Sequence, residues 1–290
     1  MKVSVLGTGL LGGAIAKRLL ARGHQVTVWN RTRTKAERLV EEGAEVAAKP
    51  ADAIGSSPLI VTVLLDGPVT RQVLLGDDGV LSLKGKTVVQ MGTIAVQESC
   101  DLAEDVERLG GRYLEAPVLG STPEAKEGAL LMMVGGQDEL FHELGPLLED
   151  LSQEPLHLGS VGKAAALKLA LNQLLLGLVG SFGLSLAMVR EAEVDIEDFM
   201  AIVRGSSLHS PQFDKKLPRM VERDFADPHF PVTHILKDIE LMLSQAGRHD
   251  LGTEALEGFR HIVERTLEMG YKEVDYSALY NGIHPPDGSG

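Results

Sequence analysis

Cysteine is nearly absent from this sequence. Cys100 is the only cysteine among 290 residues, so an intramolecular disulfide is excluded. A lone thiol is typical of proteins from a reducing compartment. The composition, 44% hydrophobic and 24% charged, is that of an ordinary globular protein with room for two domains.

Positive charge is also scarce. Lysine and arginine number 28 against 41 aspartates and glutamates, which gives a formal net charge of -13. Such a surface repels phosphate backbones, so we expect no nucleic-acid partner. A local group of basic residues is informative for the same reason.

Long apolar runs are missing as well. No stretch reaches the roughly 20 uninterrupted apolar residues of a membrane span. The first 20 residues, MKVSVLGTGLLGGAIAKRLL, resemble a signal peptide superficially, but four glycines interrupt the run and Lys17 and Arg18 follow it. We therefore expect a soluble, cytoplasmic protein with no membrane partner.

Up to about residue 160, short β-branched runs alternate with helical patterns. This alternation predicts crossover units and a mostly parallel sheet. The expected helices are 11–22, 34–42 and 97–109, and the expected strands are 2–7, 24–30, 44–48, 58–65, 86–92, 112–118, 130–136 and 155–159.

Beyond Gly162 the pattern becomes helical. Residues 163–192 form one long helical stretch, and shorter patterns follow at 196–203, 216–223, 233–246 and 254–269. The predicted organisation is an α/β domain over 1–160 and an all-α substrate and dimerisation domain over 161–290. The long helix has an apolar face too large to leave exposed, which favours helix packing and a homo-oligomer, a dimer or tetramer. Its members are Leu167, Leu171, Leu174, Leu175 and Leu178. The tail, residues 284–290, is expected to be disordered.

A glycine-rich turn follows the first predicted strand. Residues 7–12, GTGLLG, match the pattern Gly-x-Gly-x-x-Gly, which is weak alone and specific between a strand and a helix. Gly7 permits the tight turn, Gly9 lets the backbone approach a pyrophosphate, and Gly12 lets helix and strand pack closely. The helix N-terminus then offers N–H groups to the phosphates. This predicts a Rossmann-type, doubly wound domain that binds a dinucleotide through Gly7, Gly9, Leu10, Leu11 and Gly12.

The end of the second strand bears on which dinucleotide is bound. An acidic residue there would hydrogen-bond the ribose 2'-hydroxyl of NAD. This chain instead has Asn30, Arg31 and Thr32, whose amide, guanidinium and hydroxyl suit a phosphate dianion. Arg33 is a second basic residue beside them. The sequence thus favours NADP over NAD, and the alternative is a solvated basic start of the next helix.

The long helix carries a lysine in apolar surroundings. Lys168 and Asn172 are four residues apart, so they share one helical face. Desolvation depresses a lysine pKa towards values useful for proton transfer, and Asn172 can orient the lysine or a substrate. The alternative is a lysine that extends to solvent from an apolar helix.

Four blocks taken together resemble the β-hydroxyacid dehydrogenase family. They are residues 7–32, residues 115–136 (EAPVLGSTPEAKEGALLMMVGG), residues 159–173 (GSVGKAAALKLALNQ) and residues 230–243 (FPVTHILKDIELML). The resemblance extends over about residues 1–284. It implies that Lys168 is the acid/base group with Asn172 beside it, and that Thr93 lies near the nicotinamide.

The resemblance implies further roles. Gly120 would hold a substrate carboxylate through its backbone N–H, and Leu64 and Leu65 would contact the cofactor ribose region. Other matching positions line the substrate or cover the cofactor, namely Phe230, Lys237 and Asp238. The family usually has a serine where this chain has Leu119, and Ser121 and Thr122 can substitute from a different place.

The predicted function is an NADPH-dependent reductase of a small aldehyde or keto acid, of the glyoxylate or succinic semialdehyde type. The alternatives are an NAD(P)-dependent 3-hydroxyisobutyrate-type dehydrogenase, an imine reductase and a non-catalytic NADPH-binding protein. Imine reductases and non-catalytic relatives generally lack the helix lysine, so Lys168 disfavours both. No metal is expected, because the histidine spacings match no ligand pattern.

Overall fold

The structure, a computed structural model, describes residues 1–76 and 79–286. The prediction of a disordered tail falls partly on residues 287–290, which lie outside that range. The chain divides into two compact units, Met1–Leu169 and Ala170–Gly290. This division lies inside helix α9 (Lys163–Glu191), beyond the boundary expected near residue 160. The physical reason is that the start of α9 hydrogen-bonds to the first unit, through the amides of Gly162 and Ala164.

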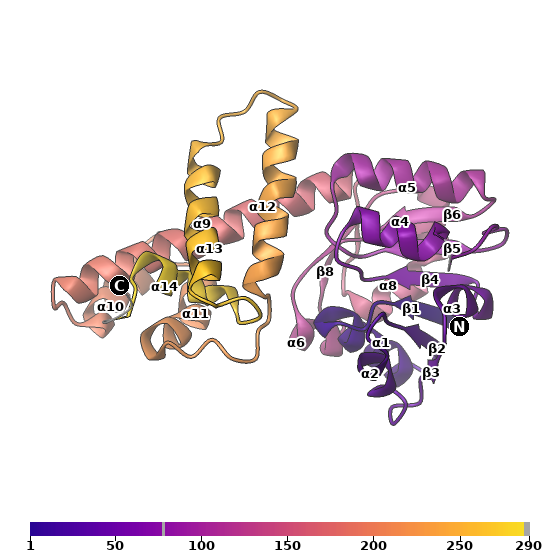
Figure 1. The fold of residues 1–290 in the computed structure, drawn as a ribbon, viewed down its shortest axis with the longest axis horizontal. Helices are drawn as coiled ribbons and strands as arrows, with labels where there is room; N and C mark the ends of the chain where they lie inside the picture. The colour runs from indigo at the N-terminus through magenta and orange to yellow at the C-terminus, as the bar shows by residue number, and fades with distance from the viewer. Residues whose placement is uncertain (77–78, 287–290) are drawn as a thin grey trace. The chain divides into compact units, whose positions relative to one another are not determined.

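A six-stranded parallel sheet forms the centre of the first unit (Figure 1). Its spatial order is β3-β2-β1-β4-β5-β6, so the strand order reverses direction between β1 and β4. In doubly wound sheets the ligand crevice lies at this reversal, outside the carboxyl ends of the strands. The predicted Rossmann-type fold is confirmed. The strands are β1 (Lys2–Leu6), β2 (Gln25–Trp29), β3 (Glu45–Val46), β4 (Leu59–Thr62), β5 (Thr87–Gln90) and β6 (Arg112–Glu115).

Helices cover both faces of this sheet, and each face has its own core. One core joins the sheet to α1 (Leu10–Ala21), α2 (Arg33–Glu37) and α8 (Gly145–Leu151). The other joins it to α3 (Pro50–Ser56), α4 (Gly67–Leu75) and α5 (Val96–Arg108). Because both faces are covered, β4 and β5 are buried at every position.

Three short strands form a separate sheet, which the sequence did not predict. β7 (Val118–Leu119) pairs antiparallel with β8 (Leu131–Val134), and β8 pairs parallel with β9 (Leu156–His157). The single strand expected over 112–118 was therefore wrong. It is divided into β6 and β7 around Pro117, whose ring nitrogen cannot donate to a ladder.

Helix α2 is shorter than predicted, and several short helices were missed. After Glu37 the chain continues as tight turns, in which Leu39 donates to Ala36 and Val40 to Glu37, three residues back. The missed helices of the first unit are α3, α4, α6 (Thr122–Glu127), α7 (Asp138–Glu143) and α8, and those of the second unit are η1 (Tyr276–Ala278) and α14 (Leu279–Ile283).

The second unit is helical, as predicted. Within the described part of it, the β-bridge between Pro231 and Asp275 is the only extended pairing. Helices α12 and α13 run side by side (Figure 1). By length and composition alone α9 could cross a bilayer, although 44% of its most apolar window is buried within the protein. The elements after α9 are α10 (Ile196–Arg204), α11 (Pro211–Glu222), α12 (Val232–Gly247), α13 (Glu254–Glu268), the 3-10 helix η1 (Tyr276–Ala278) and α14 (Leu279–Ile283).

The turn between β1 and α1 depends on close backbone approach. Gly7 adopts a φ of +97°, and a Cβ there would overlap the carbonyl oxygen of Val63. A Cβ on Gly12 would overlap the carbonyl oxygen of Gly7 and lie 3.1 Å from the Val63 Cβ. Gly13, one residue later, has its nearest neighbour at 3.7 Å, the carbonyl oxygen of Thr8. Adjacent glycines therefore differ sharply in how much space surrounds them.

This difference predicts opposite effects of two alanine substitutions on stability. Gly12→Ala forces backbone to move and should lower the free energy of unfolding by about 1–3 kcal/mol. Gly13→Ala lies inside a helix with room for a methyl group and should raise it by about 0.5–1 kcal/mol. Urea denaturation followed by the fluorescence of Trp29 measures both. Equal effects of the two substitutions would contradict the packing described for the turn.

Candidate functional site

The carboxyl ends of β1, β4 and β5 converge at one edge of the sheet. Gly7 lies against Val63 and Leu64, which follow β4. A Cβ on Gly92, which follows β5, would lie 2.7 Å from the carbonyl oxygen of Leu64. These contacts bring the glycine-rich turn, the predicted contact residues Leu64 and Leu65, and the segment carrying Thr93 to a common edge. Leu65 is 46% exposed there, as a side chain available to a ligand should be.

The start of α1 is open to an anion. Its N-cap is Gly9, which has no side chain to bond the first amides, and its first turn has no acidic residue. A Cβ on Gly9 would meet no protein atom within 4 Å, so packing does not require a glycine there. Beside it the hydroxyl of Thr8 is buried without a hydrogen-bond partner among the described residues. Free amides and positive dipole charge at such a terminus suit a phosphate.

Asn30 has a structural part in this arrangement. Its Oδ1 accepts a hydrogen bond from the Thr8 amide at 3.0 Å, and its Nδ2 donates to the Thr32 carbonyl at 2.9 Å. The side chain therefore joins the glycine-rich turn to the loop after β2. One hydrogen of Nδ2 is left over, since an amide group has two. Asn30 thus holds the loop in place and keeps one donor for a ligand.

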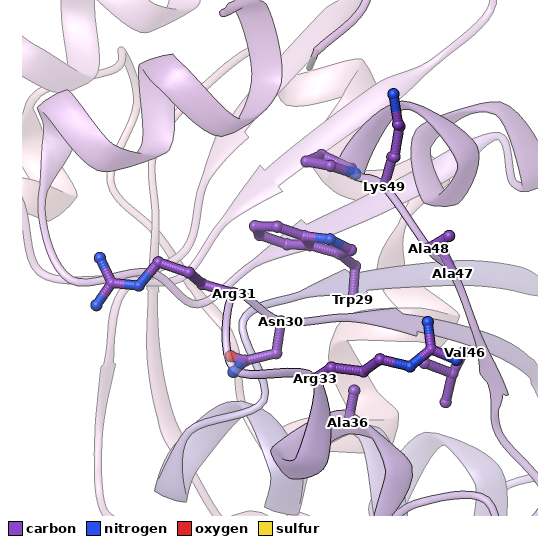
Figure 2. A pocket seen from close by; sticks show the side chains of 10 residues that line it. Trp29, Asn30, Arg31, Arg33, Ala36, Val46, Ala47, Ala48 and Lys49 are labelled. Carbon is purple, nitrogen blue, oxygen red and sulfur yellow. The ribbon is translucent and has the colours of Figure 1, made fainter. Parts of the chain in front are cut away.

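A cavity of about 240 Å³ lies beside this loop (Figure 2). Three basic side chains line it, Arg31, Arg33 and Lys49, with no acidic residue in the wall. In Figure 2 Arg31 and Arg33 leave the loop in opposite directions. Arg33 is paired with Glu37 at 2.8 Å, whereas Arg31 forms no ion pair within the described chain. Arg31 is therefore the more available of the two arginines. The other lining residues are Trp29, Asn30, Ala36, Val46, Ala47, Ala48 and Pro50.

A second cavity of about 300 Å³ reveals basic residues that the sequence analysis did not name. Thr8, Gly9 and Leu10 line one part of it, and Lys17 of α1 lies in its wall as well. The basic residues not named before are Lys35 of α2, Arg38 directly after α2, and Lys126 of α6. Lys35 lies in the helix that directly follows Asn30, Arg31 and Thr32, and this closeness in the sequence could have suggested it. An anion at the glycine-rich turn would therefore face basic residues of α1, α2 and α6.

The predicted substrate segment follows β7. Gly120 has a φ of +126°, which favours glycine, and it precedes Ser121, the N-cap of α6. The Ser121 amide donates to Glu124 Oε2 at 2.7 Å, while the Ser121 hydroxyl is buried without a partner in the described structure. Thr122, the next residue, lines the second cavity with Thr8 and Gly9. The segment thus lies near the start of α1 with an unused hydroxyl.

Lys168 lies on the second turn of α9, in the first unit. It is only 8% exposed, unlike Lys163 on the same helix, which is solvent-exposed. The first turn of α9 is bonded to Glu115 at the end of β6, and Glu115 pairs with Gln90 of β5 in the sheet register. The start of the helix that carries Lys168 is therefore hydrogen-bonded to the carboxyl edge, and Thr93 follows β5 at the same edge. Burial of the lysine, predicted from its apolar neighbours, is confirmed.

In the second unit Asn172 and Asp238 form a buried pair. Asn172 Nδ2 donates to Asp238 Oδ2 at 2.6 Å, and both residues are 1% exposed. Lys237 pairs with the other oxygen of Asp238 at 2.7 Å. The Oδ1 of Asn172 is buried with no partner among the described residues. Three residues predicted separately, Asn172, Lys237 and Asp238, thus form one bonded group within the second unit.

Phe230 lies just before α12 on a firmly held segment. Its ring contacts those of Tyr276 and His234, with centroids 5.9 and 6.2 Å away, and its carbonyl accepts from the Tyr276 amide. The neighbouring Asp275 is bound by Lys216 at 2.7 Å. Burial alone would raise the pKa of Asp275, but the charge of Lys216 and hydrogen bonds from Lys216 and Ser277 outweigh it and lower that pKa. Phe230 is therefore half-buried and packs against Tyr276 and His234.

Family models match nearly the whole chain. The model for the NAD-binding domain of 6-phosphogluconate dehydrogenase matches residues 2–161. The model for the NAD-binding domain of NADP-dependent 3-hydroxyisobutyrate dehydrogenase matches residues 162–283. The chain belongs to the β-hydroxyacid dehydrogenase family. These matches indicate an oxidoreductase that uses a nicotinamide cofactor, and the resemblance inferred from the sequence blocks is confirmed.

Two curated relatives carry different names. Glyoxylate/succinic semialdehyde reductase 1 of Arabidopsis thaliana is 30% identical over 285 residues, which cover 98% of each chain. Cytokine-like nuclear factor N-PAC of Drosophila melanogaster is 33% identical over 279 residues, covering 95% of this chain and 46% of N-PAC. This chain thus spans about half the length of the N-PAC proteins it matches. Similarity to this family therefore includes both a protein named as a reductase and a protein named as a nuclear factor.

Solved structures agree on the fold. A 3-hydroxyisobutyrate dehydrogenase from Mycobacterium tuberculosis superposes with a TM-score of 0.86 at 20% identity, covering 98% of this chain and 99% of that one. A reductive aminase from Aspergillus terreus, solved with NADPH and ethyl-5-oxohexanoate, gives 0.67 at 26% identity, covering 96% and 97%. The fold of this chain is thus similar to those of a 3-hydroxyisobutyrate dehydrogenase and of a reductive aminase.

The residues present fit a dinucleotide. The open start of α1, the unpartnered hydroxyl of Thr8 and the basic wall contributed by Arg31 and Lys35 are suited to phosphate groups. Among the described residues there is no group of three or more metal-ligating side chains.

Proposed function

We propose that this β-hydroxyacid dehydrogenase homologue is an NADPH-dependent reductase of small aldehydes or keto acids. The observation that carries the proposal is Lys168, a buried lysine on a helix that is tied to the carboxyl edge of the dinucleotide-binding sheet. An ammonium group is expensive to bury, and catalytic sites are a common reason to keep one there. The substrate type follows the Arabidopsis relative named glyoxylate/succinic semialdehyde reductase 1.

The preference for NADPH rests on charge after β2. No acidic residue lies at the end of that strand, where it would bind a ribose hydroxyl and repel a 2'-phosphate. Arg31 has no ion-pair partner within the described chain, and two further basic residues follow it, Lys35 in α2 and Arg38 directly after α2. The Aspergillus terreus reductive aminase, 26% identical to this chain, was solved with NADPH.

A nicotinamide cofactor bound at the glycine-rich turn would supply the hydride for the carbonyl carbon of the substrate, and side chains of this protein would handle the charge and the proton. Negative charge then develops on the carbonyl oxygen, where the Lys168 ammonium stabilises it and donates a proton. Asn172, one turn further along α9, orients polar groups on the same side of the helix. The Gly120 amide and the Ser121 hydroxyl hold the substrate carboxylate. Ser121 thus takes the role of the serine that the family usually has at the position of Leu119.

A second candidate is a non-catalytic NADPH-binding protein, favoured by the relatives named N-PAC. Such a protein has no use for a buried ammonium, so Lys168 argues against it. An NAD(P)-dependent 3-hydroxyisobutyrate-type dehydrogenase would use the same residues in the oxidative direction. Imine reduction shares the architecture and differs in substrate. A spectrophotometric panel of aldehydes, keto acids, 3-hydroxy acids and cyclic imines with NADPH and NADH separates these activities.

Removal of the Lys168 amine should abolish most turnover. Lys168→Ala is expected to lower kcat for glyoxylate or succinic semialdehyde by about 100-fold or more, since it removes both the proton donor and the positive charge. NADPH affinity, measured by fluorescence titration, should stay unchanged. Lys163→Ala is the matched control, because it removes the same charge from an exposed position of the same helix. Turnover of Lys168→Ala comparable with that of the control would refute the mechanism.

The two arginines after β2 should differ in their effect on cofactor choice. Arg31→Ala removes an unpaired guanidinium and should raise KM for NADPH by about 10-fold or more, with KM for NADH unchanged. Arg33→Ala should have a smaller effect, because Arg33 is engaged by Glu37. Steady-state kinetics with both cofactors give the comparison. A parallel rise of the two KM values in Arg31→Ala would argue against a 2'-phosphate contact.

The exposed apolar face of α9 supports a homo-oligomer, as part of the same proposal. Leu174, Leu184 and Met188 are 59%, 54% and 66% exposed. Several exposed large apolar side chains along one helix are typical of an interface, and a second copy could cover them with the same residues.

Light scattering coupled to size exclusion tests this assembly. The wild-type protein should be a dimer or larger, and Leu174→Glu should shift it towards monomer. Leu81→Glu, at an isolated leucine that is 98% exposed, should not. A monomeric wild-type protein, including one that binds lipid vesicles through α9, would contradict the assembly.

A further inference from the structure

Glu115 is a buried acid whose chemistry the proposed reaction does not use. It ends β6 and is only 1% exposed. A buried carboxylate is costly unless donors surround it. No lysine, arginine or histidine forms an ion pair with it within the described chain. What compensates the charge must therefore be sought among neutral donors.

Three neutral donors bind the Glu115 carboxylate. Oε1 accepts from the backbone amides of Gly162 at 2.7 Å and Ala164 at 2.9 Å. Oε2 accepts from the hydroxyl of Ser99 at 2.6 Å, and that hydroxyl lies 3.0 Å from the hydroxyl of Tyr113. Every partner of the carboxyl group is a donor, which suits the ionised, acceptor-only form.

The two amides belong to the start of α9. Gly162 immediately precedes the helix, and its carbonyl accepts the bond from Ala166 that closes the first turn. Ala164 lies within that turn. The first amides of a helix lack partners inside the helix, and its N-terminus carries positive dipole charge. Glu115 therefore supplies from β6 the cap that the chain before α9 does not provide.

The surrounding backbone is shaped to this contact. A Cβ on Gly135 would overlap Glu115 Oε1, so glycine is required opposite the carboxylate. Gly162 has a φ of +97°, and a Cβ there would come within 3.2 Å of both Cys100 Sγ and Val96 Cγ1. Gly135 and Gly162 thus leave room for the hydrogen bonds between the Glu115 carboxylate and the start of α9. These hydrogen bonds fix the place where α9 begins.

We propose that Glu115 is a positioning residue for Lys168, which is itself catalytic if the proposed function holds. The carboxylate fixes the first turn of α9 to the carboxyl edge of the sheet. Lys168 extends from the next turn, so a helix start that shifts or frays moves the ammonium relative to the segments carrying Thr93 and Gly120. Small displacements of a catalytic group can lower turnover greatly without loss of ligand binding.

Two substitutions of similar size separate the hydrogen bond from the charge. Glu115→Gln keeps an acceptor oxygen for Gly162 and Ala164, and its amide nitrogen can donate to Ser99, whose hydroxyl then points to Tyr113. Glu115→Met fills the same space with no acceptor. We expect kcat of Glu115→Gln to stay within about 3-fold of wild type and kcat of Glu115→Met to fall by about 10-fold or more. NADPH affinity should be unchanged in both, and the pH profile of kcat should be unchanged in Glu115→Gln.

Hydrogen exchange gives a readout that is independent of activity. Amides of residues 162–168 should exchange about 10-fold faster in Glu115→Met than in wild type or Glu115→Gln, because the helix start loses its cap. Val106→Ala, which opens a cavity in α5 at a fully buried position, controls for general destabilisation and should leave kcat and this segment unchanged. Should Glu115→Met fail to fold, Glu115→Ala admits water to the two amides and tests the same contact.

The outcomes distinguish this inference from the proposed function. If Lys168→Ala is inactive but Glu115→Met has wild-type kcat, the positioning role is wrong and the reductase proposal stands. The positioning role is also wrong if kcat falls as far in Glu115→Gln as in Glu115→Met, or if the pH profile of Glu115→Gln is shifted. Either result would mean that the charge of Glu115, and not its hydrogen bonds to α9, affects turnover. If Lys168→Ala is fully active, the proposed function fails, and hydrogen exchange still decides whether Glu115 holds the helix.

Discussion

The architecture of the first unit depends on backbone contact at the carboxyl edge of its sheet. At the reversal of strand order, the turn after β1 lies against the segment after β4 with no space for a side chain on Gly7 or Gly12. The same contact leaves the first amides of α1 facing outward instead of into the core. A phosphate-binding terminus is therefore a consequence of how β1, α1 and β4 pack. The loop after β2 is then joined to this turn by Asn30.

Local charge, more than net charge, decides what this edge can bind. The chain carries a formal charge of -13, yet the two cavities next to the glycine-rich turn are lined by lysines and arginines with no acidic residue in either wall. An acidic surface around a small basic region confines anion binding to that region. A small basic region can therefore suit a polyphosphate cofactor in a chain whose net charge is strongly negative.

The sequence predicted the elements that have strong periodicity and missed those that depend on local capping. The buried strands, the glycine-rich turn and the helical second unit could be read from residue patterns alone. The missed helices α3, α4, α6 and α8 are short, and each has a proline in its first turn. That signal was present in the sequence, and attention to it would have found them. The division of residues 112–118 at Pro117 has the same origin.

Contacts between distant residues could not be predicted from one sequence. Nothing near Asn172 points to Asp238, 66 positions away, or near Glu115 to the amides of Gly162 and Ala164. Such pairs form only after the chain has folded, and no local spacing encodes them. The sequence could name Lys168 and Asn172 as chemically suited residues, but only the folded structure identifies the groups that hold them in place.

Family membership by itself leaves the activity of this chain open, because relatives of similar identity carry the names of a reductase and of a nuclear factor. The physical distinction between the two lies in the cost of specific groups. Dinucleotide binding requires the glycine-rich turn and the basic loop, which a binding protein would also keep. A lysine that is 8% exposed and a buried Asn172–Asp238 pair add desolvation costs that cofactor binding alone does not require. A buried lysine and a buried Asn172–Asp238 pair are expected where a proton must be delivered to a substrate. These residues therefore argue for catalysis, whereas the fold alone does not distinguish an enzyme from a binding protein.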